Sequence, residues 1–139
     1  MASGLTTYAQ QRVLRQLFGN VSFTNPTAWY LGYSTTTPNE DGTGATEPTD
    51  LAYARKPLDN NTSNWQDLLS GTGRQNAVEV NWNSATTPQG TATYLVIYDA
   101  PTGGNMWYYT NFTVAKPLTV DDVLRAAVGS IQARIQPTA

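Results

Sequence analysis

The spacing of hydrophobic residues changes once along the chain, from a helical period to a strand period. Near the start, apolar positions recur every three or four residues, at Ala9, Val13, Leu14, Leu17 and Phe18. This spacing places them on one side of an α-helix. Arg12 and Arg15 fall on the opposite side.

The ends of this helix are also marked in the sequence. Thr7 and Gln10 have the spacing of a capping box, which satisfies free N–H groups at a helix start. Gly19 tolerates the left-handed conformation that ends many helices. These signals predict a helix over about residues 6–19. Its apolar side can pack on its own domain, which we favour, or it can act as an arm that docks on a neighbouring molecule.

From residue 27 onward, apolar and polar residues alternate as they do in β-strands. The clearest segments are Thr27–Ser34, Gln75–Trp82 and Thr91–Tyr98, and weaker ones lie around Tyr53 and Ile131. The segment Thr91–Tyr98 is the most apolar of these, which is typical of a central strand. The turn sequence DAPTGG and the segment NMWYYTNFTV follow it, so together they predict a β-hairpin. The segment PLTVDDVLRAAV fits a turn or a short helix, and we favour the turn.

Short strands separated by turns rich in proline and glycine predict the fold class. We expect an all-β protein, a jelly-roll-like antiparallel β-sandwich of seven or eight strands with one N-terminal α-helix. No repeat or linker divides the chain, so residues 1–139 are interpreted as a single domain with the sandwich over about 27–136.

The composition excludes several kinds of chemistry. The chain has no histidine and no cysteine, which removes disulfides, zinc–thiolate sites and a Ser-His-Asp triad. Eight basic residues against ten acidic ones do not favour nucleic-acid binding, and no apolar run approaches the ~18 residues of a membrane span. The first residues also lack the pattern of a signal peptide, which indicates synthesis in a cytoplasm. We therefore expect no cofactor, no nucleic-acid partner and no membrane partner.

The acidic segment Asn39–Asp50 is the first candidate for a functional site. An EF-hand loop requires oxygen ligands at alternating positions, and this segment lacks their full order and the flanking helices. We expect no metal site and no calcium requirement, and we interpret the segment as a solvated surface loop. Other carboxylates, such as Glu79 and Asp99, show no spacing that would pair them as a catalytic acid and base. The chain is therefore expected not to be an enzyme.

Aromatic residues are a second candidate feature, because the chain has four tryptophans and eight tyrosines. Trp29, Trp82 and Trp107 lie in predicted strands and are expected to fill the core or an interface. Trp65 lies in the polar segment NTSNWQD, so we expect it to be more exposed, where it could bind a sugar or a protein. Because tyrosine and tryptophan are enriched at interface cores, a homodimer or another homo-oligomer is also expected.

Several stretches in a fixed order carry a family resemblance. LTTYAQQRVLRQLFG is followed by AWYLGYSTTTPNEDGTGATEP, YARKPLDNNTSNW and ATYLVIYDAPTGGNMWYYTNF. This order resembles a family of small structural proteins of tailed-bacteriophage virions. Members of that family are often labelled tail fibre proteins, while others are similar to capsid cement or decoration proteins with a jelly-roll-like sandwich. The C-terminal segment PLTVDDVLRAAVGSIQARIQ is less typical of it.

The resemblance implies a structural role in the phage particle. A fibre needs length, and this chain has no fibre-forming repeat, so we favour a capsid cement protein. Such a protein would bind the major capsid protein on the capsid exterior and bridge its subunits. A tail fibre or tail appendage that takes part in host attachment is the alternative. The candidate contact residues are those that the core least explains: Arg12, Arg15, Asn39, Glu40, Asp41, Glu47 and Trp65.

Overall fold

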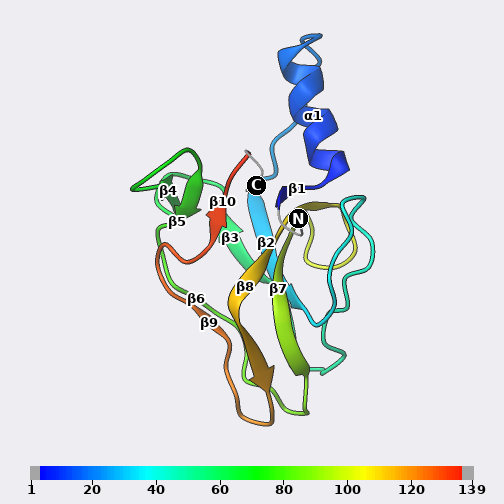
Figure 1. The fold of residues 1–139 in the computed structure, drawn as a ribbon, viewed down its shortest axis with the longest axis vertical. Helices are drawn as coiled ribbons and strands as arrows, with labels where there is room; N and C mark the ends of the chain where they lie inside the picture. Colours follow the sequence, from blue (N-terminus) through cyan, green and yellow to red (C-terminus); the bar gives the residue numbers. More distant parts are fainter. Residues whose placement is uncertain (1–3, 136–139) are drawn as a thin grey trace.

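The computed structural model describes residues 4–135, which form one helix and ten strands. These elements are β1 (Gly4–Leu5), α1 (Thr7–Leu17), β2 (Ala28–Ser34), β3 (Lys56–Asp59), β4 (Trp65–Asp67), β5 (Arg74–Asn76), β6 (Val80–Asn81), β7 (Gly90–Tyr98), β8 (Met106–Leu118), β9 (Arg125–Ala126) and β10 (Gln132–Ala133). The strand pairs are antiparallel, so the chain is an all-β sandwich with one N-terminal helix, as the sequence predicts (Figure 1).

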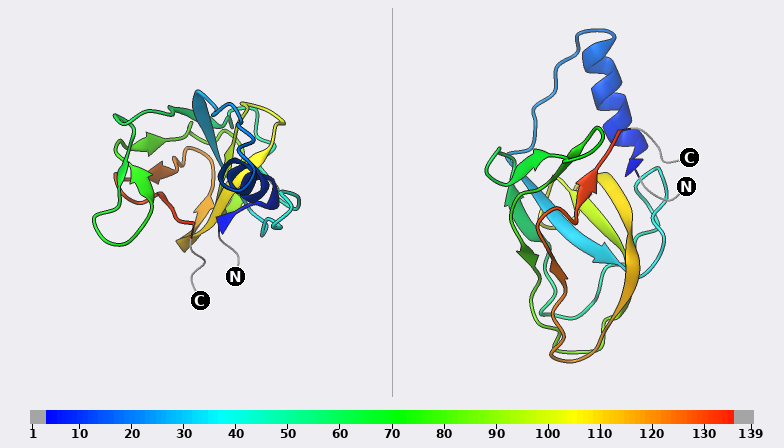
Figure 2. Two further views of the ribbon diagram at one scale, coloured as in Figure 1. Left: turned by 90° about the horizontal axis from the view of Figure 1, so that it is seen from above. Right: turned by 60° about the vertical axis from the view of Figure 1, so that its left-hand side comes forward.

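One large sheet faces two small ones. The large sheet has five strands in the order β1-β8-β7-β2-β3, and β7 is its central strand, as expected from its apolar sequence. The small sheets have the orders β10-β5-β4 and β6-β9, and Figure 2 shows them on one side of the large sheet. The β7–β8 hairpin, with its turn after Tyr98, is the pairing that the sequence predicts.

The alternation of residues along β2 and β7 gives the large sheet two different faces. The inner face carries Leu31, Tyr33, Leu95 and Ile97, which belong to the main core. The small sheets and their connections close this core with Trp65, Val80, Trp82, Leu124, Ala126 and Ile131. The alternation of Val80 and Trp82 with exposed Glu79 and Asn81 is also confirmed.

The outer face of the large sheet has a second, smaller apolar cluster. It contains Val96, Tyr98, Met106 and Tyr109, with Tyr30, Ala45 and Tyr94 packed against it. Ala45 comes from the acidic connection between β2 and β3. That connection therefore covers part of the sheet, and it is not only a solvated loop as its composition indicated.

The helix predicted over about residues 6–19 is present as α1, and its N-cap lies one residue before the capping-box signal. Its N-cap is Thr6, whose side chain accepts a hydrogen bond from the N–H of Ala9, so the prediction of Thr7 as the cap is wrong. Gln10 still satisfies a backbone group, because its side-chain amide donates to the Leu5 carbonyl. The helix ends at Leu17, close to the predicted stop.

The favoured interpretation of the apolar side of α1 is also wrong. Only Ala9 of the helix is buried, at the end that touches β8 and β1. The helix projects from the sandwich as an arm, and the chain returns to β2 through residues 18–27 (Figures 1 and 2). Its apolar residues Leu14 and Leu17 therefore remain largely exposed.

Three other local predictions have mixed outcomes. The segment Gln75–Trp82 was predicted as one strand, but β5 and β6 divide it, because Asn76 turns inward and holds the chain there. Tyr53 lies before β3 and not within a strand. Asp121 and Asp122 lie in a turn, as favoured, and the side chain of Asp122 accepts hydrogen bonds from Thr119.

Asp50 is a buried carboxylate that joins the β2–β3 connection to the segment before β7. Its oxygens accept hydrogen bonds from Thr86, from the side-chain amide of Gln89 and from the Ala52 N–H. Gln89 in turn accepts a hydrogen bond from the hydroxyl of Tyr33. The Thr86 hydroxyl is the main cause that lowers the pKa of Asp50 far below its ordinary value, while burial opposes it.

We predict that this carboxylate gives the protein an acid-dependent stability. A depressed pKa means that the stabilisation is complete above the unfolded-state pKa of ~3.9 and is lost as the pH falls toward the folded-state value. The variant Asp50→Asn should lower the melting temperature by several degrees at pH 7 and flatten its pH dependence below about pH 4. Thermal scans from pH 7 to pH 2 measure this. Asp59→Asn, at an exposed position, is the control, and equal pH profiles for both variants would contradict the prediction.

Candidate interaction surface

The structure places the acidic loop against the start of the helix that carries Arg12 and Arg15. Arg12 and Arg15 lie on α1, and the acidic loop lies at its base. The backbone N–H of Thr7 donates to the Glu40 carbonyl over 2.8 Å, and the Gln10 side chain donates to the Glu40 carboxylate over 3.1 Å. The arm and the loop therefore form one continuous surface.

The two arginines differ in their freedom. The Arg12 guanidinium donates to the Tyr8 hydroxyl over 2.7 Å and lies 4.6 Å from the centre of the Tyr8 ring. Arg15 is exposed in the last turn of α1, where a positive charge is favourable next to the free carbonyl groups. A partner can therefore meet Arg15 directly, while Arg12 presents an ordered, half-buried charge.

The acidic loop is held in shape by its own hydrogen bonds. The Asp41 carboxylate accepts hydrogen bonds from the Thr43 backbone over 2.9 Å and from the Thr43 hydroxyl over 2.6 Å. The Thr43 hydroxyl bond is the main cause that lowers the pKa of Asp41. The Asn39 N–H donates to the Thr43 carbonyl over 2.7 Å. The predicted residues Asn39, Glu40 and Asp41 are thus exposed on an ordered turn.

The apolar end of the arm is exposed, as the less favoured alternative for the helix, docking on a neighbouring molecule, would require. Leu14, Leu17, Phe18 and Val21 are 51%, 67%, 82% and 55% exposed, and we call these four residues the arm tip. The sequence signal was present, because the apolar side of the helix continues past its end into Val21.

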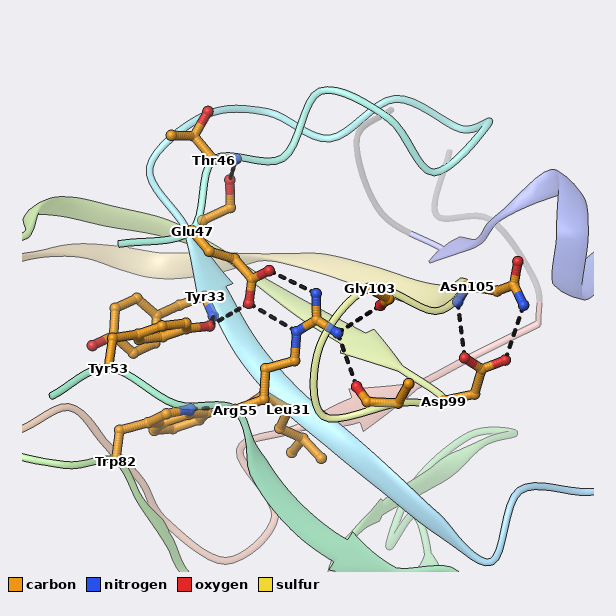
Figure 3. Close-up of polar contacts among 12 residues, drawn as sticks. Leu31, Tyr33, Thr46, Glu47, Tyr53, Arg55, Trp82, Asp99, Gly103 and Asn105 are labelled. Carbon is orange, nitrogen blue, oxygen red and sulfur yellow. Dashed lines mark hydrogen bonds and ion pairs between the residues drawn. The ribbon is translucent and has the colours of Figure 1, made fainter. Parts of the chain in front are cut away.

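Glu47 does not belong to the exposed surface as predicted. Its two carboxylate oxygens accept hydrogen bonds from Nε and Nη2 of Arg55 over 2.9 and 2.7 Å, which is a bidentate ion pair (Figure 3). The side chain of Arg55 is 6% exposed and that of Glu47 is 23% exposed. Both oxygens of this carboxylate are engaged by Arg55, so Glu47 stabilises the fold and is not available to bind another protein.

Arg55 connects this pair to the β7–β8 turn. Its Nη1 donates to the carbonyls of Ala100 and Gly103, each over 2.8 Å, and its guanidinium lies 3.5 Å from the centre of the Tyr98 ring. The Tyr53 hydroxyl donates to Glu47 over 2.5 Å, and burial together with this carboxylate raises the pKa of Tyr53. We call Glu47, Tyr53 and Arg55 the clamp, and Figure 3 shows its bonds to the turn.

Trp65 is buried, so the expectation that it is exposed is wrong. It is 8% exposed and belongs to the main core. Its indole N–H is a buried donor that has no hydrogen-bond partner within residues 4–135. Trp65 also lines a cavity of about 230 Å³ together with Leu5, Phe23, Asn25, Trp29, Asn60, Arg74, Ile97, Trp107, Tyr108 and Ala133.

Metal-binding groups and membrane-spanning helices are the remaining features to consider. Within residues 4–135, no group of three or more acidic, histidine or cysteine side chains is arranged to hold a metal ion. No helix in that part of the chain has the length and apolar character needed to cross a membrane. The expectation that calcium is not required stays a prediction, which a chelator titration of the melting temperature would test.

Comparison with known proteins places this architecture in a phage context. A family model described as podophage GP4 fiber I protein gp80 matches residues 4–134. A search among curated proteins found no significant match. The family match covers α1, both groups of strands and the clamp, and it agrees with the resemblance to phage virion structural proteins seen in the sequence.

We predict that the clamp stabilises the fold as a coupled unit. The variant Arg55→Met leaves the Glu47 carboxylate without its partner, and Glu47→Gln leaves the Arg55 guanidinium without its partner. Each variant should therefore lower the free energy of unfolding by about 3 kcal/mol. The double variant should lose clearly less than the sum, with a coupling of at least ~1 kcal/mol in urea unfolding. The exposed pair Arg125 and Glu79, 3.8 Å apart, is the control, and its variants should lose less than ~1 kcal/mol. Additive losses at the clamp would contradict the prediction.

Proposed function

Because this chain belongs to the podophage GP4 fiber I protein gp80 family, we propose that it is a non-enzymatic structural component of a phage tail fibre. The virion is accordingly its proposed location. Its contribution is mechanical: a stable folded body that is attached to other proteins of the particle through the arm.

The observation that carries this proposal is the position of the arm. The arm leaves the sandwich at one end (Figure 1), and the apolar side chains at its tip are more than half exposed. Apolar tips of this kind gain stability when a partner removes them from water, at roughly 25 cal/mol per Å². Attachment at one end leaves the opposite end of the sandwich free, which suits an appendage that extends from the particle.

The size of the body limits what this role can be. A folded chain of 139 residues has a radius of gyration of only about 14 Å, so one copy cannot form a long fibre. We propose that it forms a joint or a terminal module within an appendage. The absence of histidine and cysteine from the chain supports a role without catalysis.

Capsid cement is the second candidate function. It is favoured by the lack of a fibre-forming repeat and by a net charge of only -2, which limits repulsion between crowded copies. In that case the major capsid protein is the partner, and the arm would reach a neighbouring subunit on the capsid exterior. The arm tip and the loop around Glu40 would then form the contact.

We predict different results for the two candidates in particles assembled without this protein. A fibre component should be present in few copies per particle, and its loss should reduce adsorption to the host while heat resistance of the capsid is unchanged. Quantitative mass spectrometry of purified virions gives the copy number, and adsorption and heat-inactivation assays give the phenotype. A copy number close to that of the major capsid protein, with heat-sensitive particles that still adsorb, would refute the fibre proposal in favour of cement.

A further inference from the structure

The edge of β8 is only partly covered by neighbouring strands. β1 is two residues long and pairs with the start of β8, while β8 continues to Leu118. On the other side of β8, the register with β7 shifts between Ala92 and Tyr94, which leaves Phe112–Ala115 without partner residues in β7. Within residues 4–135, neither neighbouring strand pairs with Phe112–Ala115, and we call this segment the open edge.

A groove of about 710 Å³ lies beside the open edge. It is lined by β8 and by residues 124–132, which include β9 and the start of β10. Within residues 4–135, β9 pairs with β6 alone and β10 pairs with β5 alone. The strands on the two sides of the groove therefore do not pair with each other in that part of the chain, so the sandwich is open between them.

Residues of the main core reach this groove. Leu95, Leu124 and Ile131 line it, and each of them is at most 5% exposed. Phe112 also lines the groove and packs against the main core, while Val114 is 62% exposed. Successive side chains of a strand point to opposite faces, so a strand in the groove would place every second side chain on this apolar surface.

The backbone of the open edge favours an extended polypeptide as the occupant of the groove. A strand edge presents N–H and C=O groups in a regular row, and such a row is a template for a further strand. A second polypeptide backbone repeats its own donors and acceptors at the same rise of ~3.4 Å per residue, so it can satisfy the row in order. Pro117 has no N–H, which ends the usable edge at Lys116.

The charges at the groove favour an acidic segment. Two charged side chains line it, Lys116 and Arg125, and both are positive although the whole chain has a net charge of -2. Within residues 4–135, Lys116 forms no ion pair. Arg125 lies 3.8 Å from the carboxylate of Glu79, and its side chain is still 66% exposed. A carboxylate on an incoming strand would therefore meet a complementary charge in the groove.

We propose that the groove receives an extended acidic segment of a different protein of the particle, which adds to the open edge of β8 as a further strand. The added backbone pairs with Phe112–Ala115, its apolar side chains cover the core residues in the groove, and its carboxylate contacts Lys116 and Arg125. A second copy of this chain does not suit the groove, because it would bring the same two positive charges to it. The inference rests on the proposed place of the chain in the virion.

Zero-length carbodiimide cross-linking of purified virions tests the partner. The reagent joins a lysine amine to a carboxylate that touches it, and Lys56 and Lys116 are the two lysines of the chain. Mass spectrometry of the digested particles should find Lys116 joined to an aspartate or glutamate of a different virion protein. Lys56, which donates to Asn83, is the internal control and should give no such product. The proposal is overturned if Lys116 is joined only to its own chain or to a second copy, or to nothing, or if Lys56 reacts equally.

A synthetic peptide that spans the cross-linked carboxylate tests the addition of a strand. Bound to the purified chain, it should slow hydrogen exchange of the amides of the open edge at least about tenfold. Lys116→Glu should raise the dissociation constant of the peptide at least about tenfold, while Lys56→Glu, the matched control, should leave it unchanged. Two further peptides carry N-methyl groups on alternate amides, one on the odd and one on the even positions. One of them should lose binding, because alternate amides of a strand face its neighbour.

The contrary results of the peptide test are equally specific. Unchanged exchange at the open edge, or full binding of both methylated peptides, would refute strand addition. Binding of an acidic polysaccharide in place of the peptide, with the same loss in Lys116→Glu, would refute it as well. Copy number and adsorption test the place of the chain in the particle separately. A product between Lys116 and the major capsid protein would retain this inference and contradict the fibre, whereas a confirmed fibre without a product at Lys116 would contradict this inference alone.

Discussion

The position of Arg55 is the constraint on which the outer half of the sandwich depends. Its guanidinium holds Glu47 on the long β2–β3 connection and two carbonyls of the β7–β8 turn at the same time. The space for this network exists only because position 32 of β2 is a glycine. A Cβ atom there would lie 2.4 Å from the Tyr53 hydroxyl and 2.7 Å from the Glu47 carboxylate. Because Gly32 has no side chain, the Glu47–Arg55 pair can lie against the sheet and hold the β2–β3 connection over it.

Alternation of apolar and polar residues made most of the sandwich predictable. Segments such as Thr91–Tyr98 encode the strand period, and a strongly apolar strand needs neighbours on both sides, so its central position followed as well. Residue order alone could not show that Glu47 turns inward, because its local sequence is typical of a solvated loop. Its partner Arg55 is eight positions away, and only the folded connection brings the two together.

Trp65 and the arm tip show two further limits of sequence reasoning. The polar neighbours of Trp65 indicated exposure, but they form a turn whose backbone bonds at Asn61 and Asn64 direct the ring into the core. For the arm, the amphipathic pattern predicts that one side of the helix is buried, while most of that side is exposed in the single chain. It does not state which molecule provides the burial, because packing within a chain and packing between chains follow the same physical rule.

The rigid body and the exposed apolar tip of the arm have complementary roles in the proposed function. In the proposed role within an appendage, the body would transmit force between its two ends, so a body that deforms easily would weaken the attachment. The clamp and the Asp50 network fix the β2–β3 connection at two separate points, each by side chains with several bonds. The arm is the opposite case, since its helix is anchored at Thr6 and the side chains of its apolar tip are largely exposed. An arm that combines a fixed base with exposed apolar side chains is suited to bind a partner, and this is the physical reason to propose it as a contact within the particle.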